Sequence, residues 1–250
     1  MTEAEKSKII ELLRDDEHYY GDVGKQFLSN SNIKTLFENP ELLGQDVEKT
    51  PAMVIGGYMH TIILEPNKID GFKIIEASTR NTNKYKEISD GEVCLLEHEA
   101  DMCHAMRDRV LANDVCRDLI RGSHKDSNIE YEVPQIMEFF GNWWKCKADI
   151  LNHDEKLIID LKSTGDISRF KYSADRYNYD SQAYIYSKMF GYEFLFIAIE
   201  KKTNKIAIFN CSDDFLYRGE QKLVEANQIY DLFHKTEDFD PNQYIETLTL

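Results

Sequence analysis

The sequence lacks a long hydrophobic run, because no apolar stretch approaches the ~18–20 residues that a helix needs to cross a bilayer. Cysteine is also scarce: there are five among 250 residues, and no two of them form a CxxC pair. The sequence therefore offers no zinc or iron–sulfur site of ordinary spacing. The N-terminal stretch is charged and typical of a helix, so we expect no secretory signal, and the odd, low cysteine count indicates a reducing cytoplasm.

Basic residues are the second shortage. The chain has 30 Lys and Arg against 45 Asp and Glu, which gives a formal net charge of −15. Taken alone, this charge argues against a nucleic-acid-binding protein, because contact with phosphates needs Lys and Arg. It leaves room for a local basic groove, and it suits a protein that gathers carboxylates around divalent cations.

What is present indicates one globular domain. The hydrophobic fraction of 42% and the length of 250 residues are enough for a single sizeable core. Helical patterns dominate residues 1–125, whereas strand patterns begin near residue 126 and alternate with helices up to about 235. We expect an α/β or α+β fold in which helices flank a mixed central β-sheet, with residues 1–250 as one domain.

The residues with the clearest chemistry lie on a predicted hairpin. Residues 142–151 and 156–163 are strand-like, and the NHDE stretch at 152–155 is typical of a turn. Side chains alternate along a strand, so Asp160 and Lys162 share one face while Leu161 occupies the other. With the turn at 152–155, Asp149 lies diagonal to Asp160 at a Cα separation of ~7–8 Å.

Two carboxylates at that spacing can bind one cation. Hard oxygen ligands favour Mg²⁺ or Mn²⁺, which polarise a phosphodiester and supply a nucleophile near neutral pH. Lys162 would help to deprotonate or orient the water and offset the developing negative charge. The alternative is an exposed Asp–Lys pair on an edge strand, since a D-x-K triplet occurs by chance in many proteins.

Several motifs together resemble a known family. Asp149 followed by D-L-K at 160–162 resembles the D…(D/E)-x-K motif of the PD-(D/E)XK nuclease superfamily, although Ala148 stands where the family often has Pro. Residues 56–66, GGYMHTIILEP, resemble the G-x-x-x-H-x-x-x-L-E-P helix of RecE-type phage and prophage exonucleases. FLSNSNIKTLFENPELL, YEVPQ and KCKADIL resemble further segments of that group, and Gln182 and Tyr186 match the Q-x-x-x-Y pattern of RecB-like nucleases.

The resemblance runs from about Tyr20 to Phe233 and implies roles for individual residues. The metal ligands would be His60, Glu132, Asp149, Asp160 and the carbonyl oxygen of Leu161. The catalytic residues would be Asp149, Asp160, Lys162, Gln182 and Tyr186. Without the resemblance, a histidine in an apolar helix is more often a core residue, and a glutamate on a strand is more often a solvent-facing acid.

The resemblance also implies an activity. It predicts one or two Mg²⁺ or Mn²⁺ ions and hydrolysis of linear duplex DNA from the 5′ side, which leaves a 3′ single strand for phage-type recombination. The implied partners are double-stranded DNA ends, a single-strand annealing protein and further copies of the chain in a ring, in a phage- or prophage-encoded protein of a bacterial host. No iron–sulfur cluster is expected, because Cys211 alone follows the catalytic strand.

Two basic islands are candidate DNA contacts. Arg80 and Lys84 form one, and Arg169, Lys171 and Arg176 form the other, which directly follows the strand of Asp160. Trp143 and Trp144 alternate faces, so at most one of them belongs to the core.

Two alternatives to the exonuclease stay open: another PD-(D/E)XK nuclease (an endonuclease, a repair enzyme or an RNA-cutting enzyme), and a non-catalytic acidic DNA mimic or inhibitor.

Overall fold

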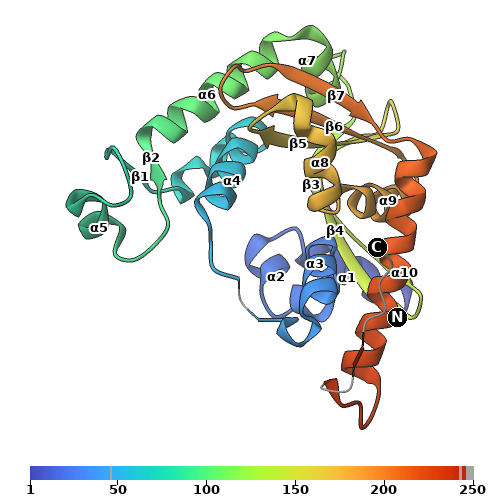
Figure 1. The fold of residues 1–250 in the computed structure, drawn as a ribbon. Coiled ribbons are helices and arrows are strands. Elements are labelled where there is room, and N and C mark those ends of the chain that lie inside the picture. The colour runs from blue at the N-terminus through green and yellow to red at the C-terminus, as the bar shows by residue number, and fades with distance from the viewer. Residues whose placement is uncertain (46, 242–243, 246–250) are drawn as a thin grey trace.

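The structure is a computed structural model that describes residues 1–45, 47–241 and 244–245. Its centre is a five-stranded sheet in which the strands follow chain order, and β5 and β6 form the one parallel pair. The strands are β3 (Ile129–Phe139), β4 (Asn142–Asn152), β5 (Leu157–Thr164), β6 (Glu193–Glu200) and β7 (Ile206–Asn210). The predicted mixed sheet with flanking helices is therefore confirmed (Figure 1).

Helices cover both faces of the sheet. One face is covered by α4 (Pro51–Leu64), α6 (Glu97–Ala112) and α7 (Asp114–Arg121). The other is covered by α8 (Phe170–Arg176), α9 (Tyr179–Phe190) and α10 (Asp213–Lys235). The alternation of β5 explains both layers, because Ile159 and Leu161 pack toward α4 and Ile158 packs toward α9.

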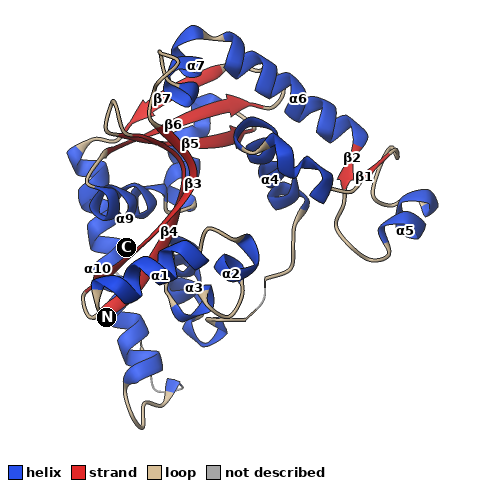
Figure 2. Cartoon of the chain, turned by 180° about the vertical axis from the view of Figure 1, so that it is seen from behind, coloured by secondary structure: helices blue, strands red, loops and turns tan. Residues whose placement is uncertain are grey.

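The remaining elements lie at the periphery. They are α1 (Glu3–Leu12), α2 (Asp16–Tyr20), α3 (Asn30–Glu38), β1 (Ile74–Ile75), α5 (Asn83–Ser89) and β2 (Leu95–Leu96). Short 3₁₀ turns cover Gly24–Gln26, Pro40–Leu42, Pro66–Gly71 and Ile167–Arg169. In the view from behind, α1 to α3 lie along β4, and β1, β2 and α5 lie beyond α4 (Figure 2). Among the described residues, no helix is both long and apolar enough to cross a membrane.

The β4–β5 hairpin forms as predicted, but its register differs. Its ladder pairs Asn152 with Leu157 and ends at Ile150 with Ile159, so the turn occupies residues 153–156 instead of 152–155. Asp149 is therefore level with Asp160, not diagonal to it. The side chain of Asn152 helps to fix this register, since its Oδ1 accepts the N–H of Glu155 at 3.0 Å.

The two strands separate just beyond Ile150, and the N-terminal segment covers the edge that is freed. Leu28 donates its N–H to the carbonyl of Trp143 at 2.9 Å and accepts the N–H of Lys145 at 2.7 Å. These bonds pair the outer half of β4 with the segment that leads into α3. The segment before α3 is thus held beside β4, near the point where β5 departs.

Three local predictions need correction. The polar residues 69–93 predict a strand followed by a mobile loop, but the structure has α5 in this stretch, which Thr82 caps and which the buried Tyr85 anchors through bonds to Cys94. The periodicity of residues 94–120 predicts one helix, which is interrupted at Asn113, the residue that caps α7. The pattern of residues 176–190 also predicts one helix, but α9 begins later, because Asn178 adopts a left-handed conformation (φ 54°) and separates α8 from α9.

Candidate metal centre

Asp149 lies where the side chains of β4 stop alternating regularly between the two faces of the sheet. Ala148 packs toward α9 and Ile150 packs toward α4, so the regular pattern is interrupted at the residue between them. The carboxylate of Asp149 turns toward the neighbouring strand, where Oδ2 accepts the N–H of Leu161 at 2.9 Å. The gap between the separating strands is thus filled by an acidic side chain that a backbone amide orients.

His60 reaches the same point from α4. Its Nε2 donates to the carbonyl oxygen of Leu161 at 2.8 Å, and its Nδ1 lies 3.4 Å from Oδ2 of Asp149. Thr50 caps the start of α4, since its hydroxyl accepts the N–H of Met53, and the helix ends before Pro66. The histidine is one-quarter exposed, so it is not a core residue.

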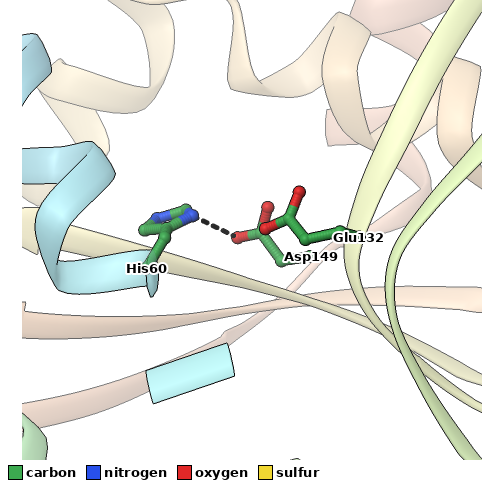
Figure 3. Close-up of side chains that lie close together, drawn as sticks. All are labelled: His60, Glu132 and Asp149. Carbon is green, nitrogen blue, oxygen red and sulfur yellow. Dashed lines mark ion pairs between the residues drawn. The ribbon is translucent and has the colours of Figure 1, made fainter. Parts of the chain in front are cut away.

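Glu132 completes the cluster from β3. It adopts a left-handed backbone conformation with φ 49°, which is uncommon outside glycine, and the β3–β4 ladder has no pair at this residue, between Tyr131–Ile150 and Val133–Ala148. One donor atom from each of Glu132, Asp149 and His60 lies within 4.8 Å of the other two. Figure 3 shows the three side chains pointing toward one another from β3, β4 and α4.

Asp160 and Lys162 form a second group on β5. Nζ of Lys162 lies 2.7 Å from Oδ2 of Asp160, and the amide of Gln182 on α9 donates to Oδ1. The ring of Tyr179 lies 4.8 Å from the same ammonium. Burial and the nearby charge of Asp149 raise the pKa of Asp160 to about 6, against the opposing effect of Lys162.

The ammonium of Lys162 stays charged in this environment. Burial alone would lower the pKa of Lys162, but the negative charge of Asp160 outweighs burial and raises that pKa above its ordinary value. The side chain therefore carries a positive charge at neutral pH in the metal-free protein. Of the two roles predicted for Lys162, stabilising negative charge fits this state, and accepting a proton from water does not.

Tyr186 lies behind the acids. It packs against the clusters beneath α9, and its ring centroid is 5.8 Å from that of Phe194. Burial raises the pKa of Tyr186 well above its usual value, so its hydroxyl is neutral at any working pH. Gln182 is the member of the Q-x-x-x-Y pair that contacts an acid of the site directly.

The donor set fits a divalent cation. An imidazole nitrogen and two carboxylates converge, with the carbonyl of Leu161 beside the imidazole, and such a mixture suits Mn²⁺ or Mg²⁺. Burial, followed by the negative charge of Asp149, raises the pKa of Glu132 to about 8. A cation between the two carboxylates would relieve this repulsion.

The raised pKa predicts how the metal-free protein responds to pH. A carboxyl whose folded pKa lies above its unfolded value favours folding below pH ~4.5, and this contribution is lost as the pH rises through about 8. We expect the Tm in EDTA to fall between pH 6 and pH 8.5 by roughly 5 °C more in the wild type than in Glu132→Gln. Thermal denaturation followed by circular dichroism measures both slopes.

The control for this prediction is Glu155→Gln, which removes an exposed acid from the β4–β5 turn. Its slope should match that of the wild type. If Glu132→Gln gives the wild-type slope as well, Glu132 does not carry the repulsion described above.

The two basic islands differ in their surroundings. Arg80 donates twice to Glu99 and once to the carbonyl of Cys94, and Lys84 pairs with Glu76. This island lies with β1, β2 and α5, away from the acids of the sheet (Figure 1). Its charges are matched by neighbouring acids.

The second island directly follows β5 and is open to solvent. Arg169, Lys171 and Arg176 are exposed, and so are the rings of Tyr172 on α8 and of Tyr177, the residue that follows α8. Aromatic rings between cations are typical of surfaces that contact single-stranded nucleic acid. The tyrosines were not singled out from the sequence, although their alternation with Arg and Lys is readable there.

A further group beside the site was missed in the sequence. Lys145 and Lys147 on β4 lie 4.2 and 4.3 Å from the ring of Tyr19, and Nζ of Lys147 lies 2.6 Å from Oδ1 of Asp16. Next to them, Tyr20 is 69% exposed. The period-two spacing of the lysines is visible in the sequence, but their contact with α2 is not.

Trp144 is the core member of the tryptophan pair. It is fully buried, and its indole N–H donates to Oδ1 of Asn227 at 3.1 Å. Trp143 is partly buried and packs beside Tyr19 and Phe27. One of the two belongs to the core, as the alternation predicts.

Comparison with known proteins supports the fold. A model of the family described as a PDDEXK-like domain of unknown function (DUF3799) matches residues 25–243. The structure of a "putative exonuclease" from Eubacterium rectale is similar, with a TM-score of 0.64 and 17% identity over 94% of this chain and 96% of that one. A phage-related exonuclease from Haemophilus somnus gives a TM-score of 0.36 and 14% identity, covering 82% and 93% of the two chains. Among curated proteins, none matches the sequence.

Proposed function

Since the chain belongs to the family of PDDEXK-like domains of unknown function, we propose that it is a divalent-metal-dependent deoxyribonuclease. The observation that carries the proposal is the meeting of His60, Glu132 and Asp149 from three elements. These side chains lie at the base of β5, the strand that carries the Asp160–Lys162 pair. Within the PD-(D/E)XK superfamily, that combination of acids and a lysine is the catalytic motif.

The residues of the site have three different roles: binding the cation, stabilising charge and orienting Asp160. His60, Glu132, Asp149, Asp160 and the carbonyl of Leu161 would hold one or two cations, which supply the Lewis acidity that phosphodiester hydrolysis needs. The ammonium of Lys162 stabilises negative charge that develops on the phosphate. Gln182 fixes the orientation of Asp160 by donating to Oδ1, and so keeps Oδ2 beside Lys162.

The second proposal concerns the substrate. We propose linear duplex DNA that is degraded from its 5′ ends, because the motif GGYMHTIILEP resembles the corresponding helix of RecE-type exonucleases. The exposed basic and aromatic surface of α8 lies where the sheet strand of Asp160 ends and is suited to a phosphate backbone. Assembly into a ring and cooperation with a single-strand annealing protein in the cytoplasm of a bacterial host belong to the same proposal.

A pair of end-labelled substrates tests activity and polarity together. Linear duplex DNA carrying a label at the 5′ ends or at the 3′ ends is incubated with the protein and Mn²⁺ or Mg²⁺. We expect the 5′ label to be released first, as mononucleotides, and release to stop in EDTA.

The other outcomes separate the alternatives. Early loss of the 3′ label would contradict the polarity, and internal fragments from circular DNA would indicate an endonuclease. Intact DNA and intact RNA under every metal would contradict the nuclease and favour an acidic binding protein.

A further inference from the structure

A cavity of about 610 Å³ lies beside β4, outside the metal centre. It is enclosed by the segment from Tyr20 to Asn32, by the β3–β4 turn and by the last turn of α10. Ser29, Ser31 and Asn32 at the start of α3 contribute polar side chains to its wall.

The charge of this cavity is opposite to that of the protein. None of the nineteen described residues that line it is Asp or Glu, although the chain has 45 acids among 250 residues. Three lysines and a histidine line it: Lys25, Lys145, Lys235 and His234. Lys235 also pairs with Asp231 at 3.1 Å. A cavity that excludes acids in such an acidic protein is suited to an anionic ligand.

Lys145 is the buried cation of the cavity. Its side chain is only 7% exposed, and among the described residues the carbonyl of Tyr19 is the one acceptor of its ammonium. Gly24 leaves the space that the ammonium uses, because a Cβ at this position would lie 2.5 Å from Nζ. Burial and the neighbouring charge of Lys147 lower the pKa of Lys145 to about 8, and an anion in the cavity would counter both.

The cavity and the metal centre lie along the same strand, β4. Trp143 and Lys145 line the cavity, Lys147 follows on the same face, and Asp149 lies two residues beyond Lys147. Asp149 is four positions along the strand from Lys145, which corresponds to about 13 Å. Tyr20 links the two regions, because its ring lines the cavity and lies 5.8 Å from Nζ of Lys147.

We propose that this cavity binds an internal phosphate of the nucleic-acid strand that enters the metal centre, with Lys145 as its neutralising cation and Tyr20 as a stacking surface for a base. The distance of about 13 Å places this phosphate a few nucleotides along the strand from the metal centre. The proposal rests on the proposed function only for the nature of the strand. Binding can be measured without cleavage, so failure of one does not imply failure of the other.

The test measures binding in EDTA. Fluorescence anisotropy of a labelled 20-nucleotide single strand, and of the same strand in a duplex, is recorded between 50 and 200 mM NaCl. We expect Lys145→Met to weaken binding of the strand about tenfold and to reduce the salt slope by about one unit. The matched control is Lys8→Met, which removes an exposed lysine of α1 and should change affinity less than twofold.

A second variant guards against misfolding at the buried position. Tyr20→Ala removes an exposed ring and should weaken binding about tenfold with an unchanged salt slope, since base stacking is not a phosphate contact. Inorganic phosphate and a mononucleotide are titrated as competitors to distinguish a free phosphate ligand from a strand. Wild-type affinity for the strand in both variants would overturn the proposal. Variants that bind the mononucleotide more weakly but bind the strand with wild-type affinity would overturn it as well.

Discussion

Asp149→Asn should reduce the rate of DNA cleavage by about 10³-fold or more while leaving the protein folded. The substitution keeps the shape of the side chain, and an amide oxygen can still accept the N–H of Leu161. It removes the negative charge that lies between His60 and Glu132, and this charge is needed to hold a divalent cation.

The stability of the same variant separates lost chemistry from lost structure. The charge of Asp149 contributes to raising the pKa of Glu132 and of Asp160, so its removal relieves repulsion between acids in the metal-free protein. We therefore expect the Tm in EDTA to be equal to that of the wild type or higher. The stabilisation that Mn²⁺ gives to the wild type should be lost.

Release of acid-soluble nucleotides from linear duplex DNA measures the rate. Glu155→Gln, on the turn of the same hairpin, serves as the control and should retain wild-type activity. Cleavage by Asp149→Asn within tenfold of the wild-type rate would show that this carboxylate is not part of the reacting centre.

The sequence predicted the acids of the site because their positions depend on local structure. A hairpin with a short turn brings Asp149 and Asp160 together in nearly any register, and alternation then places Lys162 beside Asp160. His60 needed the resemblance, since nothing local distinguishes it from a core histidine in an apolar helix.

What the sequence could not predict depends on contacts between distant segments. The left-handed conformation of Glu132 and the interrupted alternation at Asp149 arise where β5 leaves β4. From the sequence alone, Lys145 and Lys147 resemble ordinary exposed lysines of a strand. Their contact with the ring of Tyr19 depends on the position of α2, a distant segment of the chain. The pairing of Arg80 with Glu99 likewise joins two segments that no local pattern connects.

The pair formed by Asp160 and Lys162 predicts a large effect on stability. The carboxylate is 3% exposed, and its contact with the ammonium is 2.7 Å. Removing one partner leaves a buried charge without compensation, which typically costs about 3–5 kcal/mol. We expect Lys162→Met in EDTA at pH 8 to lower the free energy of unfolding by about 3 kcal/mol, because the buried Asp160 then either carries an uncompensated charge or must take up a proton at that pH.

The double variant Asp160→Asn/Lys162→Met isolates the cause. Removing both charges eliminates the uncompensated carboxylate, and an asparagine can still accept the bond from Gln182. The double variant should therefore recover most of the lost stability and remain inactive. Below pH 5 the two variants should converge in stability, because protonation of Asp160 removes the buried charge of the single variant.

Urea denaturation at pH 5 and pH 8 measures the free energy of unfolding of the wild type, the single variant and the double variant. Equal stability of the single and double variants at pH 8 would mean that Lys162 does not compensate Asp160 in the folded protein. Lys162 would then act only on the substrate and would not contribute to the stability of the folded protein. The predicted recovery would instead mean that the lysine also compensates a buried carboxylate, so that the metal-free site depends on Lys162 for its stability.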